Sequence, residues 1–559
     1  MAPTLWEEIA AADTVFSDLV HADMTEQHTP VYSWNLGPET VRRLGEIHSF
    51  YECASGFNIE GIPQSSENGS PRFDSLDQVE LYLNLYFRYS HSSIPFIHRA
   101  TFDPGKCSAG LLYVMCIVGV ADADPTGSES FLQTCLTLMV TERLAELARN
   151  AMRSKGGQCL LSALASSALV LYLSLVHRDA VSQDQCYMLL FQTIHLAEAH
   201  GLFDHTNLSR AANYSADISI SANVWGCWTR SESVKRLILC LILLESSFTR
   251  LFRVPIEMHR AYVLISLPSP ESAFQAGSVQ HFMGAISSHA GLVAPPVTDI
   301  QEHTVQKIDD FAFRILTSLA YLAHHQGSCH CSATDHALRI LSTAMPADGH
   351  EPRTLLIWNH LRIVSSANMG EIHGIFGKGD VQHAGESLGN FQTWSRTLQA
   401  RQCVIHAAQN YRILSNSRIP RDNMCHLDTI LFDSALVLAA YILYAEDSTV
   451  NPQPHLIVLD LIHTLRSKDP SDLWLSIYQD PNNGANLTPP DSNYHGLLRF
   501  LNGSSQVCFR QSGTPPQTAV QDIMFSYASL IDEVSPHHGQ AYSALLRGIG
   551  HQIKALLKI

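Results

Sequence analysis

The chain has 559 residues, of which 46% are hydrophobic and 16% charged, so it can build a large core and is not disordered overall. Its formal net charge is −16 and it has no run of five or more basic residues, which excludes a chain that binds nucleic acid by itself. The 13 cysteines are scattered, without a C-x-x-C pair, which favours free thiols in a reducing compartment.

Residues 1–75 are expected to form an N-terminal acidic and apolar helix followed by a linker. Between Leu5 and Asp23, bulky apolar residues alternate with acidic ones. This pattern is typical of a helix that covers the core, which we favour, or of a short partner-binding helix. The first residues lack a basic flank before an apolar stretch, so no signal peptide is predicted.

Residues 76–88 predict an amphipathic helix, because their apolar side chains recur at three- to four-residue steps. Pro95 then stops helix propagation, since proline lacks the amide donor. The segment after the helix reads P-F-x-H-R-x-T-F and consists of Pro95, Phe96, His98, Arg99, Thr101 and Phe102. His98 and Arg99 could form a site, but a structural hydrogen-bonding element is the interpretation that we prefer.

Two further helices are predicted between residues 156 and 201. The first, 156–176, has no charged residue and is long enough to cross a membrane. Its four serines and the acidic chain around it favour a buried helix instead, and we expect no membrane association. The second helix ends in A-x-x-x-G-L, where Gly201 is predicted to cap the helix in a left-handed conformation.

Residues 225–244 predict a long helix with a polar beginning and an apolar end. Trp228, Glu232 and Arg236 follow one another at four-residue steps and therefore share one face. The run Leu237 to Leu244 is apolar on every side, so this part of the helix is expected to lie inside a bundle.

Together these blocks resemble the fungal-specific transcription factor domain, the helical regulatory part of many fungal gene regulators. The resemblance rests on the P-F-x-H-R-x-T-F segment, the A-x-x-x-G-L helix end and the W-x-x-x-E-x-x-x-R helix, and it is best over residues 76–280. It implies a regulatory domain over 76–445, a location in the nucleus, and no catalytic, cofactor-binding or metal-binding residues. It also implies control of metabolic or secondary-metabolite genes, with a small-molecule effector as an option.

Members of this family normally carry a zinc module that reads DNA before the helical domain. Tetrahedral zinc needs about four Cys or His ligands on short loops, and the first seventy residues contain only one cysteine, Cys53. We therefore expect DNA to be contacted indirectly, through a homodimeric or heterodimeric DNA-binding partner or a module missing from this chain.

The remaining sequence predicts helices and long loops, with no alternating strand pattern of useful length. Apolar-periodic segments lie at 305–324, 353–367, 386–415, 427–446, 454–466, 520–532 and 540–558. Residues 446–559 are expected to form a C-terminal helical extension with a flexible loop near 480–518, which is rich in Pro, Gly, Asn and Ser. The predicted fold class is all-α, a large multi-helix bundle with long loops.

Four local patterns point weakly to an alternative, an all-α enzyme or small-molecule-binding protein with a pocket among its helices. Ser387 lies in a G-x-S-x-G sequence, but no buried strand precedes it, and we favour a helix start. Residues 374–380 are glycine-rich but lack the G-K-[ST] ending of a phosphate loop. Asp309 and Asp310 lack the acidic partner that a magnesium site would need.

The fourth pattern is a group of ligand-type side chains whose spacing matches no standard zinc site. Its members are His324, His325, Cys329, His330, Cys331 and His336. A polar helix end followed by a loop is the interpretation that we prefer.

Overall fold

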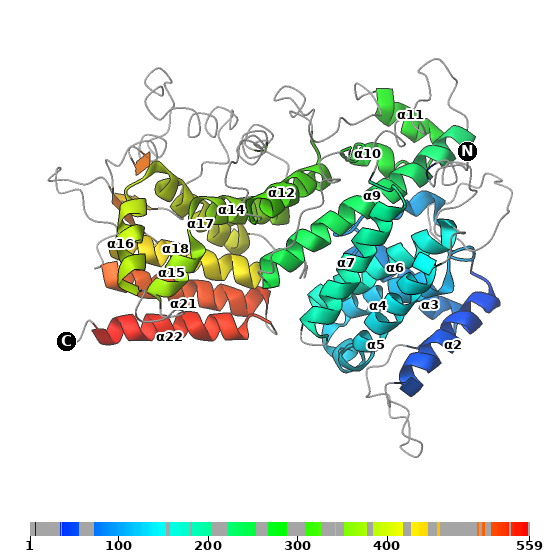
Figure 1. Cartoon of the computed structure of the whole chain (residues 1–559), viewed down its shortest axis with the longest axis horizontal. Coiled ribbons are helices and arrows are strands. Elements are labelled where there is room, and N and C mark those ends of the chain that lie inside the picture. Colours follow the sequence, from blue (N-terminus) through cyan, green and yellow to red (C-terminus); the bar gives the residue numbers. More distant parts are fainter. Residues whose placement is uncertain are drawn as a thin grey trace. The chain divides into compact units, whose positions relative to one another are not determined.

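The chain divides into two compact units, unit 1 (Met1–Ile300) and unit 2 (Gln301–Ile559) (Figure 1). The domain limits predicted at residues 75 and 445 stay predictions. The computed structural model describes residues 6, 34, 36–54, 72–152, 157–178, 181–203, 222–252, 266–287, 308–325, 341, 351–376, 384–416, 426–444, 456–458, 500–501, 506–508, 516–535 and 538–556.

The secondary structure elements described in unit 1 are all helices or 3-10 turns. Its elements are α2 (Pro38–Ala54), α3 (Leu76–Tyr89), the 3-10 turn η1 (Arg99–Thr101), α4 (Ala109–Ala123), α5 (Pro125–Met152), α6 (Gly157–Val176), α7 (Gln183–Ala199), α9 (Ala222–Phe252), α10 (Glu271–Phe274) and α11 (Val279–Ser287). The predicted all-α class is confirmed. Helices α2, α4 and α5 were not singled out from the sequence.

Local sequence explains where the helices of unit 1 begin. Ser75 is the N-cap of α3, and its side chain and that of Gln78 form a reciprocal capping box. Ser108 caps α4 in the same position, because its hydroxyl accepts a hydrogen bond from the amide of Leu111 at 3.2 Å.

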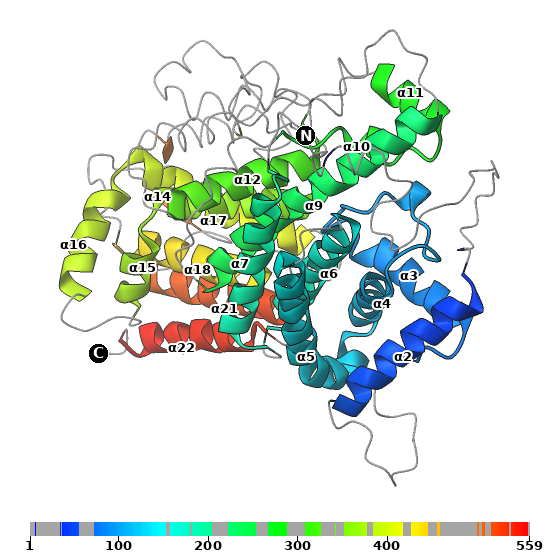
Figure 2. The same cartoon turned by 45° about the vertical axis from the view of Figure 1, so that its right-hand side comes forward.

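The core of unit 1 is built around α4, which lies between α3 and α6 (Figure 2). The contact between α3 and α4 is close enough to require glycine. A Cβ atom on Gly119 would lie 2.2 Å from the carbonyl oxygen of Tyr82 and 2.7 Å from the amide nitrogen of Tyr86. Since both atoms belong to the backbone of α3, no side chain fits at position 119 without moving the helices apart.

Among the helices that the structure describes, α6 and α18 are long and apolar enough to cross a membrane. Most of the residues in both are buried inside the protein, which is how the core helices of large soluble bundles behave. In α6, Ser166 and Ser174 donate their hydroxyls to carbonyl oxygens one turn earlier, those of Ser162 and Val170. These two serines therefore satisfy their hydroxyl donors within the helix.

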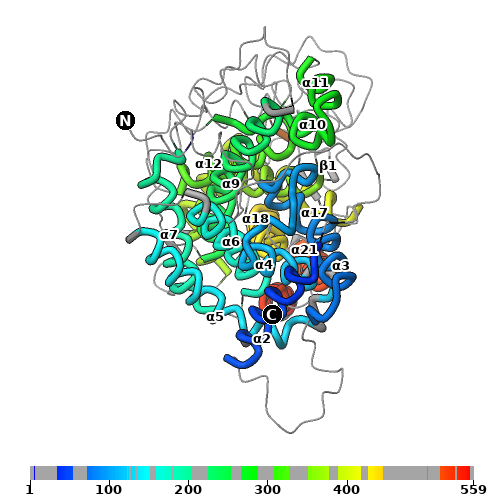
Figure 3. Tube along the Cα trace, turned by 90° about the vertical axis from the view of Figure 1, so that its right-hand side faces the viewer, coloured from blue at the N-terminus to red at the C-terminus, as the bar shows by residue number. Residues whose placement is uncertain are grey.

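Unit 2 is a set of packed helices with one pair of short strands. Its elements are α12 (Asp310–His325), α14 (Pro352–Ser366), α15 (Met369–Ile375), α16 (Ala384–Ser395), α17 (Leu398–Asn416), α18 (Leu427–Tyr444), β1 (Leu456–Val458), β2 (Gln506–Cys508), α21 (Pro516–Val534) and α22 (Gln540–Leu556). Helices α14, α17, α18, α21 and α22 pack one against the next in this order (Figure 1). Helix α17 contacts both α18 and α21, and all three are labelled in Figure 3.

Three details of unit 2 differ from the sequence-based prediction. The segment 386–415 is two helices, α16 and α17, rather than one. Leu456–Val458, predicted as part of a helix, is a strand that pairs in parallel with Gln506–Cys508. Phe500 and Leu501 are buried although they fall in the predicted surface loop, and the carbonyl oxygen of Leu501 accepts a hydrogen bond from Arg401 Nε at 2.8 Å.

Candidate functional site

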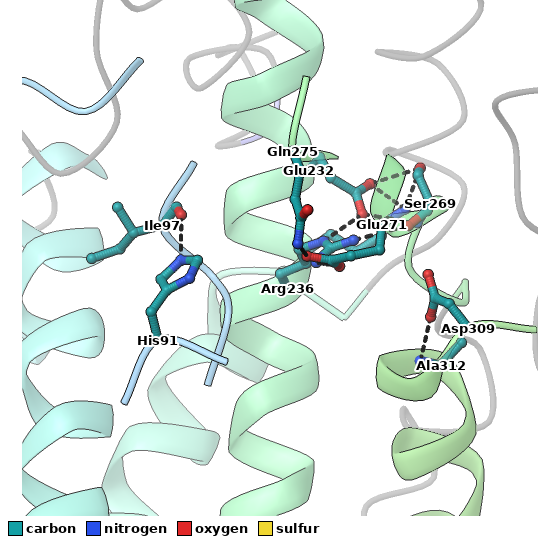
Figure 4. Close-up of polar contacts among 10 residues, drawn as sticks. His91, Ile97, Glu232, Arg236, Ser269, Glu271, Gln275, Asp309 and Ala312 are labelled. Atoms are coloured by element: carbon teal, nitrogen blue, oxygen red, sulfur yellow. Dashed lines mark hydrogen bonds and ion pairs between the residues drawn. The ribbon is translucent and has the colours of Figure 1, made fainter. Parts of the chain in front are cut away.

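The P-F-x-H-R-x-T-F segment forms a buried turn that ends in η1. Pro95, Phe96 and His98 are buried, and His98 Nδ1 lies 2.9 Å from the hydroxyl of Thr101. This contact closes the turn, because it joins the residue before η1 to the last residue of η1. The preceding turn is held by His91, whose Nε2 lies 2.7 Å from the carbonyl oxygen of Ile97 (Figure 4).

Arg99 and Phe102 pack on an aromatic cluster rather than into an open cleft. The Arg99 guanidinium lies 5.3 Å from the ring centre of Phe87 on α3, within the range of a cation–π contact. The ring of Phe102 lies 5.8 Å from Phe87 and 5.9 Å from Trp34. The segment therefore anchors the end of α3 to the turn that precedes α4.

Gly201 ends α7 in the predicted left-handed conformation, with φ at 69°. The amide of Gly201 donates to the carbonyl of Glu198 at 2.9 Å, and the amide of Leu202 donates to that of Ala197 at 3.0 Å. These two bonds make a Schellman motif, in which glycine is favoured because it has no Cβ to clash.

Arg236 is the centre of a buried polar network, which we call the Arg236 hub. The side chain is fully buried. Nε lies 3.1 Å from Glu232 on the preceding turn of α9. One terminal nitrogen lies 2.6 Å from Glu271 of α10, and the other donates to the carbonyl oxygen of Ser269 at 2.9 Å (Figure 4).

Glu232 is held in the hub from several sides. Its carboxylate accepts hydrogen bonds from the amide and the hydroxyl of Ser269, at 2.8 and 2.9 Å. The ammonium of Lys235 lies 2.6 Å from the second carboxylate oxygen. Burial opposes ionisation of Glu232, but the charges of Lys235 and Arg236 and these hydrogen bonds outweigh it, so the pKa of Glu232 is below its ordinary value.

Phe274 of α10 joins the hub to the first motif. The guanidinium of Arg236 lies 3.8 Å from the ring centre of Phe274, and the imidazole of His98 lies 5.2 Å from the same ring. His98 also meets Trp225 at the start of α9, edge to face, at 5.7 Å. Two blocks about 130 residues apart in the sequence therefore meet at one aromatic ring.

His98 of the first motif and His91 of the turn before it are held in the neutral form. Burial lowers the pKa of His98 to about 4, and the charge of Arg236 acts in the same direction. Burial likewise lowers the pKa of His91 to about 4, against the effect of the bond to Ile97. Near neutral pH both imidazoles are uncharged hydrogen-bonding groups rather than proton donors.

The hub joins segments of unit 1 through paired charges. It contains two carboxylates, Glu232 and Glu271, and two cations, Lys235 and Arg236, so its charges balance. These contacts fix the loop 266–270 and α10 to the side of α9. Trp228 extends the same face, because its ring packs on Phe282 of α11 with ring centres 4.4 Å apart.

Unit 2 contains a second buried polar cluster, in which one carboxylate lies between two histidines. Asp433 on α18 is 3.1 Å from His360 Nε2 on α14 and 2.9 Å from His373 Nε2 on α15. The imidazoles meet different oxygens of the carboxylate, so the three groups do not converge on one point as metal ligands would. Within the described ranges, no group of three or more His, Cys, Asp or Glu side chains is arranged to hold a metal ion.

The ionisation of Asp433 gives a test of this cluster. Burial opposes ionisation, but the hydrogen bonds from His360 and His373 hold its pKa below the usual range. Because the pKa of Asp433 is lower in the folded chain than in the unfolded chain, the ionised carboxylate stabilises the fold at pH values above the unfolded pKa of about 3.9. This stabilisation is lost as the pH falls through the pKa of the folded chain.

We expect Asp433→Asn to lower the free energy of unfolding by about 2–3 kcal/mol at pH 7, because two buried donors lose an ionised acceptor. The difference from wild type should shrink when urea unfolding is measured from about pH 5 to about pH 3. The exposed carboxylate Asp522 on α21 provides the control, since Asp522→Asn should change little. A difference that stays constant over this pH range would contradict the assignment.

Among the described residues, one enzyme-like sequence lies within a helix and another lies at the start of a helix. Gly385 to Gly389 lies entirely within α16, so Ser387 is on a helix and not on the tight strand-to-helix turn of a nucleophile elbow. Asp309 caps α12, because its carboxylate accepts the amide of Ala312 at 2.9 Å (Figure 4). The carboxylate of Asp310 accepts the amide of Glu351 at 3.2 Å.

The remaining weak patterns fall largely outside the described residues. His324 and His325 are the last two residues of α12, but Cys329, His330, Cys331 and His336 lie beyond the described ranges. The glycine-rich segment is described only as far as Phe376, where α15 ends.

The partners that complete the hub could not be identified from the sequence. Ser269, Glu271 and Phe274 lie 33 to 38 positions after Arg236, too far for any helical spacing to relate them. The functional role of the motif residues stays a prediction.

Two of the comparisons with known proteins agree with the resemblance. Residues 83–295 match the family model described as fungal specific transcription factor domain. A curated relative described as "Transcription factor", from Gibberella fujikuroi, is 20% identical over 419 residues, which cover 72% of this chain and 52% of the relative. The aligned part of the chain thus spans about half the relative's length. No solved structure matches the chain.

Proposed function

We propose, from the fungal specific transcription factor domain at residues 83–295, that this chain is a fungal regulator of transcription. The observation that carries the proposal is that the motif residues of this domain form structural contacts. The Arg236 hub fixes α10 and the loop before it to α9, and His98 ties the turn after α3 to the same ring. Such an arrangement suits a rigid scaffold on which partners or effectors act.

We further propose that the chain works in the nucleus with a DNA-binding partner, as a homodimer or heterodimer. The net charge of −16 supports this view, because phosphate contacts need a concentration of Lys and Arg. Control of metabolic or secondary-metabolite genes and response to a small-molecule effector are parts of the same proposal that the family suggests.

A DNA-binding measurement tests whether this chain needs a partner to contact DNA. Purified alone at physiological salt, the chain should bind duplex DNA no more tightly than about 10⁻⁴–10⁻⁶ M, the range of non-specific binding. Fluorescence anisotropy with labelled duplexes from candidate promoters measures this. Sequence-specific nanomolar binding by the isolated chain would contradict the need for a partner.

Chromatin immunoprecipitation of the tagged chain tests the function itself. Occupancy at defined promoters, lost when the gene of a candidate zinc-cluster partner is deleted, would support a regulator that acts through a partner. Occupancy that persists in every partner deletion would support direct contact, and no occupancy at any promoter would count against the regulator.

A further inference from the structure

Trp6 contacts a residue of unit 1 that is far away in the sequence. Its side chain is 1% exposed, and the indole nitrogen donates a hydrogen bond to the carbonyl oxygen of Gly201 at 3.2 Å. The two residues are separated by 195 positions. The position of this indole is specific, because an indole buried elsewhere would leave its N–H donor without a hydrogen bond.

The Schellman motif at the end of α7 explains why Gly201 can accept the hydrogen bond from Trp6. The amides of Gly201 and Leu202 are used inside the motif, and the positive φ of Gly201 turns the chain away from the helix axis. The carbonyl oxygen of Gly201 is then available to an outside donor, and it is the atom that accepts from Trp6. We call Gly201, Leu202 and Phe203 the α7 cap surface, of which the last two side chains are buried.

We propose that the α7 cap surface is a docking site for a tryptophan carried by an acidic amphipathic segment. The occupant in this structure is the chain's own Trp6, which belongs to the N-terminal segment 1–23. Other segments of this chemistry on partner proteins would compete for the same place. The proposal does not depend on the function in transcription.

Charge does not supply the attraction at this place. The segment 1–23 is acidic in sequence, and the C-terminal end of a helix is its negative pole. Glu198 lies on the last turn of α7 and adds a negative charge. The indole of Trp6 therefore carries the docking.

Docking of the chain's own Trp6 is expected to block the α7 cap surface for a separate peptide that is added. A tethered segment acts at an effective concentration on the order of millimolar, so a free peptide of the same sequence competes poorly with it. Removing Trp6 from the chain, but not from the peptide, should therefore expose the site.

Fluorescence polarisation with a labelled peptide of residues 1–23 tests the proposal on the full chain. The peptide should bind the Trp6→Ala chain at least about tenfold more tightly than the wild-type chain, because in the latter the site is already filled. A peptide that carries Trp6→Ala should bind neither. The Trp34→Ala chain, which loses a tryptophan of unit 1 bonded to Asn84, should behave as wild type.

Several results would overturn the proposal: equal affinity for the wild-type and Trp6→Ala chains, no binding to either, or equal binding of the peptide that lacks Trp6. Raising the salt from about 50 to about 300 mM should leave the affinity unchanged or increase it, since screening removes repulsion. A steep loss with salt would show that charge, not Trp6, carries the docking. If Trp6→Ala fails to fold, Trp6→Phe, which cannot donate to Gly201, takes its place and should give an intermediate affinity.

Discussion

Replacing Arg236 with alanine is expected to lower the free energy of unfolding of unit 1 by about 3–5 kcal/mol, the usual cost of breaking a buried ion pair by removing one partner. The cost arises from the groups left behind. Glu232, with its side chain only 2% exposed, would keep its charge without the guanidinium, and the carbonyl oxygen of Ser269 would lose its donor. Phe274 would also lose the group that covers its ring.

Ion pairs on the surface provide the control that distinguishes the effect of burial from the effect of charge pairing. Arg42 on α2 contacts Glu39 and Glu46 at helical spacings of three and four residues, but its side chain is 57% exposed. Arg42→Ala should leave the urea midpoint close to that of wild type, because exposed pairs contribute little. If Arg236→Ala shifted the midpoint no more than Arg42→Ala, the hub would not be a stabilising clasp.

The double variant Glu232→Gln/Arg236→Met tests whether the loss comes from an unpaired charge. Neutral side chains of similar volume remove both charges together, so part of the stability lost in Arg236→Ala should return. A double variant that is less stable than Arg236→Ala would mean that the polar contacts to Ser269 matter more than the balance of charge.

Local patterns in the sequence predicted those parts of the fold that depend on local physics. The apolar spacing of α3, the all-round apolar run of α9 and the glycine that ends α7 each depend on backbone geometry within a few residues. Burial of Leu237 to Leu244 is confirmed, since each of these side chains is at most 4% exposed.

Contacts between distant segments could not be predicted from spacing. The parallel pair β1 and β2 joins segments 50 positions apart, and the three-residue strand is too short to show an alternating pattern. Burial of the thiols is equally non-local, because Cys159 on the first turn of α6 is exposed while Cys116 and Cys240 are buried. Which face of a helix is covered depends on its neighbours.

In the candidate site, too, local spacing predicts some contacts and contacts between distant segments could not be predicted. Glu232 and Arg236 could be paired from their four-residue spacing, but the strength of the pair depends on burial, which the loop 266–270 provides. His360, His373 and Asp433 were not singled out at all, because they lie on three different helices and no helical spacing relates them. Only the packing of α14, α15 and α18 brings them together.

Introducing a charge at Leu241 is expected to destabilise unit 1 by several kcal/mol, because Leu241 is fully buried in the middle of α9 with Cys240 and Ile242 buried beside it. A carboxylate at this position has no partner and must either stay ionised in an apolar environment or take up a proton, and both cost free energy. The loss of leucine packing adds to this cost.

Thermal and urea unfolding of Leu241→Asp measure this effect, with Leu81→Asp as the control on the same unit. Leu81 on α3 is 53% exposed, so the same substitution there should stay within about ±0.5 kcal/mol of wild type.

Ser387→Ala in α16 should be equally silent in stability. If Leu241→Asp unfolded like Leu81→Asp, the second half of α9 could not be a core helix. If Ser387→Ala abolished a cellular phenotype without unfolding the chain, the interpretation of α16 as a plain structural helix would have to be replaced by one in which Ser387 acts in function.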